Sequence, residues 1–471
     1  MNTKIIYIAF FLGILGACSE DFTDLAPISQ RNVQNFYKTA TDMEVAVNAA
    51  YSVLLKSGTY NESYWIMQEM RSDNTDQGPG STGLARERTV IEEFQEISTS
   101  ELVTNAYIDS YLCISRCNIV IDRIEAVEMD QSLKDQLTGE VLFLRSLMYY
   151  HLAVAFGNVP LILTETRSVE EGNDHVQVSA DVIYNQIIQD LAEAESLLPV
   201  SYAGNDIGRA TRGAAATLLA KAHLTVKDNG AAETVLRRII SDYGYSLVPD
   251  YNDLWGVENE NGMESIFEIQ FQGGAVGTGN VFTNDFSPLP ALQTSVGAYR
   301  NRPTRDLLAA YEPDDERLFA SMDTSYIDAQ GMLLTNTSDD IRFIVKYGTD
   351  NPFNEGDAPN NFIVLRYADV LLMLAEAIGE DDEAYGLINQ VRTRAGLGPV
   401  DTGTPGTFEE KLLQERRVEL AFENHRWADL KRFGVAISVM QAQGKAANLL
   451  FPIPQREIDL NPETFIQNPG Y

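Results

Sequence analysis

The chain has 471 residues, of which 44% are hydrophobic and 22% are charged, a composition typical of a folded globular protein. Its 68 acidic residues outnumber 35 basic ones and give a formal net charge of −33. This balance argues against a nucleic-acid partner, because no surplus of Lys or Arg is available to displace counterions from phosphates, and against electrostatic docking on anionic lipid.

The N-terminal segment predicts a bacterial lipoprotein. Lys4 supplies a positive charge, and Ile5–Leu15 is an apolar run too short to span a bilayer. Small residues then precede Cys18 in the sequence Leu15-Gly16-Ala17-Cys18. We therefore expect residues 1–17 to be a signal peptide and Cys18 to carry the lipid that anchors the mature protein. The alternative is an ordinary cleaved signal in which Cys18 is incidental.

Helical periodicity dominates the first half of the chain. Amphipathic or apolar helices are expected over Asp42–Leu55, Glu101–Val127, Leu137–Phe156, Ser179–Leu198 and Thr211–Val226. The second of these is apolar on two faces, which is typical of a helix packed between neighbours in an α-solenoid. Paired helices at roughly 30- to 45-residue spacing are similar to tetratricopeptide (TPR) architecture.

The middle of the chain has a different pattern. Residues 250–360 are rich in Gly, Pro, Asn and aromatic residues and contain one strand-like run, Ser265–Phe271. The stretch Gly58–Thr99 is also predicted to be irregular. Helices are expected again over Arg366–Ile378, Glu383–Ala395 and Thr407–Asn424, followed by an extended, Pro-containing tail over Phe451–Tyr471.

The usual catalytic signatures are missing from the sequence. No HExxH, CxxC, P-loop, GxSxG or GxGxxG motif occurs, and the four histidines are scattered. Cys113 and Cys117 share one helical face, so we expect two buried thiols rather than a disulfide. The acidic clusters at residues 312–316 and 380–383 lack the alternating spacing of a calcium loop and are expected to be solvated helix starts, with no metal bound.

The glutamates Glu415, Glu419 and Glu423 lie in one row on a predicted helix. A glycosidase needs two carboxyl groups that face each other across the sugar, which a single row does not provide. Because Arg416, Arg417, Arg426 and Asp429 surround them, we expect a buried ion-paired network. Arg145, inside an apolar helix, is likewise expected to pair with a carboxylate.

A series of sequence blocks in this order resembles the SusD/RagB family of outer-membrane lipoproteins of Bacteroidetes. The blocks include Asp42–Tyr51, Phe156–Leu161, Gly208–Ala215, Leu365–Leu372, Asn389–Leu397, Glu415–Arg432 and Gln467–Tyr471. The resemblance implies a mostly α fold of about four TPR-like helix pairs, mainly in residues 42–243 and 361–424. A loop-rich subdomain of about residues 250–360 is inserted in this single domain, which spans residues 18–471.

The same resemblance implies a surface-exposed binder that is not an enzyme and needs no cofactor. It would deliver glycan to a SusC-like TonB-dependent transporter. A RagB-like peptide-binding lid is the alternative within the fold. A secreted glycan-degrading enzyme is the alternative from another class, and the missing catalytic constellation argues against it.

The ligand site is expected on two loop segments that hold aromatic residues beside short polar ones. Trp65, flanked by Tyr60 and Tyr64, would stack on sugar rings, because Trp255 and Trp427 are expected in the core. The polar contacts would come from Arg71, Asp73 and Asn74, and the Gly-rich loop Asp76–Gly83 would extend the site. The opposite wall would come from the insertion, with the residues Phe282, Asn284, Phe286 and Tyr299.

Overall fold

The computed structural model describes residues 36–78, 83–288, 297–328, 330–335, 340–349, 351 and 353–471. The predicted signal peptide and Cys18 lie outside these residues. Among the described residues helices predominate, and the named strands form two-stranded sheets. None of the described helices is both long and apolar enough to cross a membrane.

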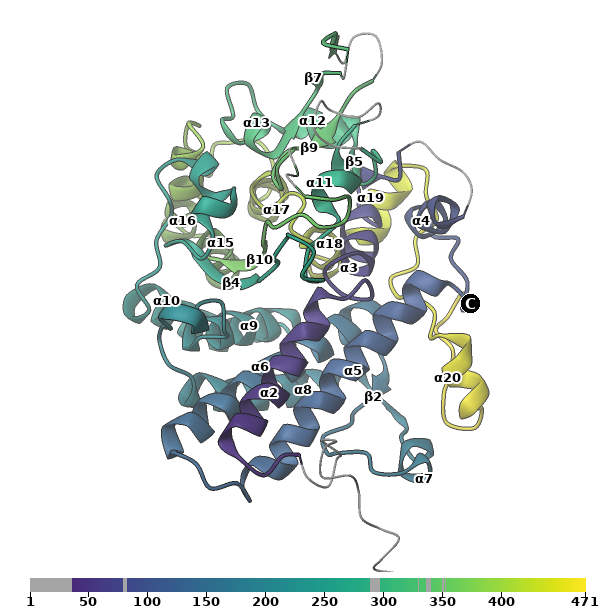
Figure 1. Ribbon diagram of the computed structural model, residues 1–471. Coiled ribbons are helices and arrows are strands. Elements are labelled where there is room, and N and C mark those ends of the chain that lie inside the picture. The colour runs from purple at the N-terminus through teal and green to yellow at the C-terminus, as the bar shows by residue number, and fades with distance from the viewer. Residues whose placement is uncertain are drawn as a thin grey trace, which may run out of the picture.

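The first half of the chain forms a stack of antiparallel helices, as the periodicity predicts. They are α2 (Ala40–Tyr51), α5 (Glu101–Ile124), α6 (Gln131–Phe156), α8 (Ala180–Leu197), α9 (Arg212–Thr225) and α10 (Asn229–Asp242). Each packs on the next, α5 on α6, α6 on α8, α8 on α9 and α9 on α10, and α2 lies across α5 and α6 (Figure 1). The mostly α, TPR-like fold is therefore confirmed.

The helices of the last third of the chain continue this stack. They are α15 (Tyr367–Ile378), α16 (Asp382–Arg394), α17 (Phe408–Glu419), α18 (Arg426–Arg432), α19 (Ala436–Ala442) and α20 (Gln455–Leu460). Helix α10 packs on α15, which in turn contacts α16 and α17. The superhelix is thus continuous across the inserted segment that separates α10 from α15 in sequence.

The loop-rich insertion is closed at its base by an antiparallel pair of strands. Strand β4 (Ser265–Ile269) pairs with β10 (Phe362–Arg366), with Ile269 opposite Phe362. The elements between them gather at the top of Figure 1. They are α11 (Phe282–Phe286), β5 (Arg302–Pro303), α12 (Arg305–Ala310), α13 (Arg317–Ser321), β6 (Met322–Asp323), β7 (Ser325–Ile327), β8 (Leu333–Thr335) and β9 (Phe343–Ile344).

Two segments expected to be irregular contain helix. The stretch Gly58–Thr99 holds α3 (Ser63–Trp65), a π-helical turn at Ile66–Met70, strand β1 (Thr75–Asp76) and α4 (Leu84–Glu92). The C-terminal tail holds α20. A π-helical turn breaks the 3.6-residue repeat, so periodicity in the sequence cannot reveal it.

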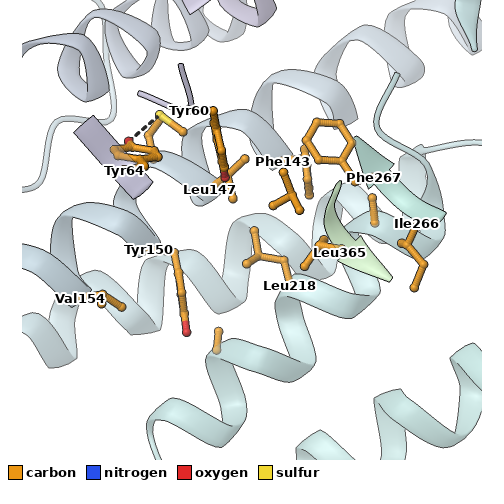
Figure 2. Packing of buried hydrophobic residues seen from close by; sticks show 14 of the residues in the cluster. Tyr60, Tyr64, Phe143, Leu147, Tyr150, Val154, Leu218, Ile266, Phe267 and Leu365 are labelled. Carbon is orange, nitrogen blue, oxygen red and sulfur yellow. Dashed lines mark hydrogen bonds between the residues drawn. The ribbon is translucent and has the colours of Figure 1, made fainter. Parts of the chain in front are cut away.

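One hydrophobic cluster extends from Met43 to Phe465 and includes residues from both halves. The β4–β10 pair covers α6 and α9, where Phe267 meets Phe143 edge-on with ring centroids 4.8 Å apart (Figure 2). Cys113 and Cys117 are buried, free thiols on α5, as predicted. Arg145 pairs with Asp190 at 2.8 Å, which confirms the expected buried partner.

A buried ionic network joins α17 to the insertion and to α15. Arg366 lies within 2.9 Å of Glu264, Glu419 and Glu423, and all four side chains are almost completely buried. Arg317 pairs with Glu415 and Glu419, and Lys346 with Glu423, so the insertion supplies two of the cations. The expectation of a structural network rather than a glycosidase pair fits these contacts.

Candidate functional site

The aromatic residues predicted to stack on a ligand are buried in the structure. Trp65 is 1% exposed and meets the ring of Phe286 edge-on at a centroid distance of 5.3 Å. Tyr60 and Tyr64 direct their hydroxyls inward, to His151 Nε2 at 2.7 Å and to Ser110 at 2.8 Å. Phe282 stacks on Phe286 and is fully buried. The prediction that these rings are exposed is therefore wrong, because they form the packed support of the insertion.

The polar residues predicted beside Trp65 are also buried. Arg71 bonds Glu96 at 2.6 Å, and its guanidinium lies between the rings of Phe94 and Phe451. Its Nη2 also donates to the Asn448 carbonyl near the C-terminus. Arg71 therefore anchors the tail and does not face a ligand.

Asp73 and Asn74 connect the segment to the C-terminal helices. Asp73 pairs with Arg426 at 2.8 Å and with Arg417 at 3.0 Å, while Asn74 donates to Glu69. Burial disfavours the charged form of Asp73, yet the hydrogen bond and charge of Arg426 lower its pKa below the ordinary value. These residues stabilise the fold, contrary to the predicted ligand contact.

Asn284 and Tyr299, predicted for the opposite wall, are similarly enclosed. Asn284 accepts hydrogen bonds from Asn351 and from the Gly356 amide and is 3% exposed. Tyr299 is 8% exposed; its hydroxyl accepts from the Arg342 amide and donates to the Asp340 carbonyl.

The two predicted loop segments nevertheless meet. Strand β1 pairs antiparallel with β5, so that Asp76 lies opposite Arg302, and Thr304 Oγ1 donates to the carbonyl of Asp73. The buried aromatic residues lie within these two segments, and charged side chains emerge from the ladder. The two segments predicted from the sequence therefore form a common surface, but the side chains on this surface differ from the predicted ones.

This surface, which we name the arginine–aspartate platform, consists of charged side chains around the β1–β5 ladder. Arg302 Nε lies 2.9 Å from Asp76, and Arg305 Nε lies 3.0 Å from Asp340. The buried side chain of Arg342 also pairs with Asp340, at 3.0 Å. The side chain of Arg305 is 76% exposed, while those of Arg302, Asp76 and Asp340 are about a quarter to a third exposed. The platform thus presents paired charges that are partly exposed in the described part of the chain.

Three residues of this region have a left-handed backbone. Tyr299, Asn301 and Asp340 have φ values of 54°, 52° and 53°. Such conformations are costly for residues with a Cβ and persist where the surrounding structure enforces them, often at functional sites. Here the Tyr299 ring lies beneath Arg302, with the guanidinium carbon 5.7 Å from the centroid, so the strained residue supports the platform.

The Asp76 carboxylate favours the charged form of Arg302. Burial alone would lower the pKa of Arg302, but its hydrogen bonds to Asp76 and the charge of that carboxylate raise it. Planar guanidinium groups donate, and carboxylates accept, so the Arg302–Asp76 pair presents both halves of the hydrogen-bonding pattern of a sugar hydroxyl. In the described part of the chain no three His, Cys, Asp or Glu side chains are grouped as metal ligands.

The sequence held one signal for this platform. The run Arg300-Asn301-Arg302-Pro303-Thr304-Arg305 places three arginines close together in an otherwise acidic chain. Arg302 and Arg305 pair with Asp76 and Asp340, which lie far away in sequence, so no local pattern identifies these pairs. The run contains no aromatic residue, so a sugar site predicted from aromatic residues does not include it.

Comparison with known proteins identifies similar chains. Residues 343–449 match a family described as the SusD family, and residues 21–224 match one described as "Starch-binding associating with outer membrane". The SusD-like protein P2 of Formosa agariphila is 25% identical, with 99% of each chain covered.

Two solved structures are also similar. One, a laminarin-binding SusD-like protein, is 30% identical with a TM-score of 0.81, over 92% of this chain and all of the other. The second is surface glycan-binding protein A from Bacteroides thetaiotaomicron in complex with laminarihexaose. It is 25% identical with a TM-score of 0.79, again over 92% of this chain and all of the other.

Proposed function

The chain belongs to the SusD/RagB family, and from this membership we propose that it binds glycan at the bacterial outer membrane and passes it to a SusC-like TonB-dependent transporter. Two relatives with a named ligand bind laminarin or laminarihexaose, which makes neutral β-glucan oligosaccharides the first ligands to test. Cys18 would carry the lipid anchor, with the folded part exposed on the cell surface.

The observation that carries the proposal is the arginine–aspartate platform. A neutral glycan offers neighbouring hydroxyl groups that both donate and accept hydrogen bonds, and the paired Arg302 and Asp76 supply the complementary groups in fixed geometry. Preorganised groups lose little entropy on binding, which favours affinity. The Tyr299 ring supports the pair, with the Arg302 guanidinium carbon 5.7 Å from its centroid.

The test is calorimetric titration of the purified chain with laminarihexaose, maltohexaose, cellohexaose and a mixture of short peptides. Saturable binding of an oligosaccharide, without release of new reducing ends, is the expected result. Binding of peptides alone would favour the RagB-like alternative. Cleavage of the oligosaccharide at enzymatic rates would contradict the binding role.

A further inference from the structure

A hollow lies on the surface next to β4, apart from the arginine–aspartate platform. It measures about 460 Å³ and lies between β4 and the ends of the helices α8 and α10; we name it the tyrosine hollow. Its walls include Tyr202, Tyr243 and Tyr245. An adjoining hollow of about 340 Å³ shares the loop Ile207–Arg209 and the floor of β4. Figure 1 shows β4 beside α9 and α10, well below β5 of the platform.

The three tyrosines of this hollow are half-buried and held by their hydroxyls. Tyr243 donates to Glu195 at 2.6 Å, and Tyr202 donates to Glu140 at 3.3 Å. The Tyr245 hydroxyl lies 3.1 Å from that of Thr211. Because each hydroxyl is tethered, the ring orientations are fixed before any ligand arrives, which reduces the entropy lost on stacking.

Two glycines of the block Gly208–Ala215 make room for this arrangement. A Cβ on Gly213 would lie 2.4 Å from the Tyr245 hydroxyl, so the ring can cover the start of α9 only because Gly is there. Gly208 has φ +97°, and a Cβ there would lie 2.4 Å from the Gln270 side chain. The sequence block that marks the family thus also shapes the hollow.

The charged groups that line the hollow already have partners. Arg209 donates to Glu140, Asp206 and Asn48, each at 2.8 Å. Glu268 accepts from the Asn261 amide and from the Asn361 side chain. What faces a ligand are aromatic rings, small hydroxyls and the exposed amides of Asn261 and Gln270, which bond each other at 3.0 Å. This chemistry suits an uncharged, hydroxyl-rich ligand.

The floor of the hollow argues against an extended peptide. Peptides add to a sheet by pairing with an exposed strand edge. Residues Ile266–Ile269 of β4 are only 2–5% exposed, so their backbone groups are not available for such pairing. An oligosaccharide needs side-chain faces and amides instead.

From these observations we propose that the tyrosine hollow is a second binding site for a neutral oligosaccharide, distinct from the arginine–aspartate platform. The ligand class rests on the proposed function, but the location does not. Two sites on one chain would allow different segments of one polymer, or two oligomers, to be held together, which raises the overall affinity for long chains.

The experiment separates the two sites by substitution. Calorimetry with laminarihexaose, maltohexaose and cellohexaose is run on the wild type, Arg302→Ala, Tyr202→Ala and the double variant. Tyr202→Phe keeps the ring. Tyr367→Ala, made alone and together with Arg302→Ala, is the matched control, since Tyr367 is a half-buried tyrosine that lines neither hollow. Melting curves confirm that each variant is folded.

Arg302→Ala should still bind oligosaccharide at the hollow, and adding Tyr202→Ala should weaken this remaining binding about tenfold. Tyr202→Phe should bind with an affinity close to that of the wild type. The second site is refuted, and the proposed function stands, if the wild type binds but Tyr202→Ala and Tyr367→Ala have equal affinities. This equality must hold in the wild-type chain and in the Arg302→Ala chain. If Tyr202→Ala removes all binding and Arg302→Ala none, the hollow is supported and the platform is refuted. Absence of oligosaccharide binding by the wild type refutes both.

Discussion

Arg366 Nη1 lies 2.6 Å from Glu419 Oε1, and neither side chain is exposed to solvent. Arg394 also contacts Glu419, and Arg317 lies 2.9 Å from its other oxygen. Burial disfavours the Glu419 carboxylate, but the charges of Arg394, Arg366 and Arg317 outweigh it and hold the pKa of Glu419 well below the ordinary value. One carboxylate thus neutralises cations from three segments of the chain.

Removal of this carboxylate should destabilise the whole protein. Glu419→Ala removes a counter-charge that three buried guanidinium groups share, and we expect a loss of roughly 3–5 kcal/mol in the free energy of unfolding. Arg416→Ala should act similarly, because Asp369 and Asp429 both pair with it at 2.8 Å. Urea unfolding measures the loss. Selective loss of glycan binding with an unchanged unfolding curve would mean that the network is part of the ligand site.

The arginine–aspartate platform leads to a prediction about affinity. Arg302→Ala removes the partly exposed guanidinium that pairs with Asp76, and we expect about tenfold weaker binding of the cognate oligosaccharide with little change in melting temperature. Arg237→Ala is the control, since Arg237 is a surface arginine paired with Glu233 and Glu383 on the helical side. Equal affinities for the two variants would move the site away from the platform.

Trp65→Ala is expected to affect stability before binding. Sequence reasoning favours a tenfold loss of affinity with little change in the fold, but the ring is 1% exposed and packs on Phe286. Truncation of a buried Trp leaves a large cavity, which costs roughly 3–5 kcal/mol. Thermal unfolding should show the effect directly. A variant with an unaltered melting curve would show that Trp65 is not part of the core.

Glu69 leads to a prediction about pH dependence. Burial raises the pKa of Glu69 from 4.5 to about 7 in the folded chain, although hydrogen bonds from Asn74 and the Phe422 amide oppose the shift. The folded state therefore retains a proton that the unfolded state has lost between these values. The stabilisation of the folded state by this bound proton is complete below pH 4.5 and is lost as the pH rises through 7.

We therefore expect the unfolding free energy of wild type, relative to Glu69→Gln, to fall by about 3 kcal/mol between pH 4.5 and 8. Denaturant titrations of both proteins across this range measure the difference. Parallel pH profiles would show that Glu69 titrates normally.

The lipid anchor remains a prediction from the sequence, because Cys18 lies outside the described residues. Cys18→Ala should release the protein from the outer membrane or leave it mislocalised, which fractionation and protease accessibility on whole cells would detect. The same variant in a strain without the transporter removes retention by that partner. Unchanged surface attachment in both strains would exclude lipidation as the anchor.

Features that depend on local sequence spacing can be predicted from the sequence, whereas features that depend on contacts between distant segments cannot. The two apolar faces of α5 and the buried Arg145 could be identified because each depends on helical spacing or on a charge inside an apolar run. Trp65 was misplaced because its π-helical surroundings have no regular period and its packing partner, Phe286, is far away in sequence. Asp340 could not be identified for the same reason, since only the tertiary fold brings it to Arg305.

The closure of the insertion by β4 and β10 has a consequence for protein engineering. A segment whose two ends are paired, Ile269 opposite Phe362, can in principle be exchanged between relatives without a change in the distance that the scaffold must span. Arg317 and Lys346 nevertheless reach out of it to Glu415, Glu419 and Glu423. A chimera that transplants ligand preference by swapping this cassette must therefore keep these two cations, or buried carboxylates of the host lose part of their counter-charge.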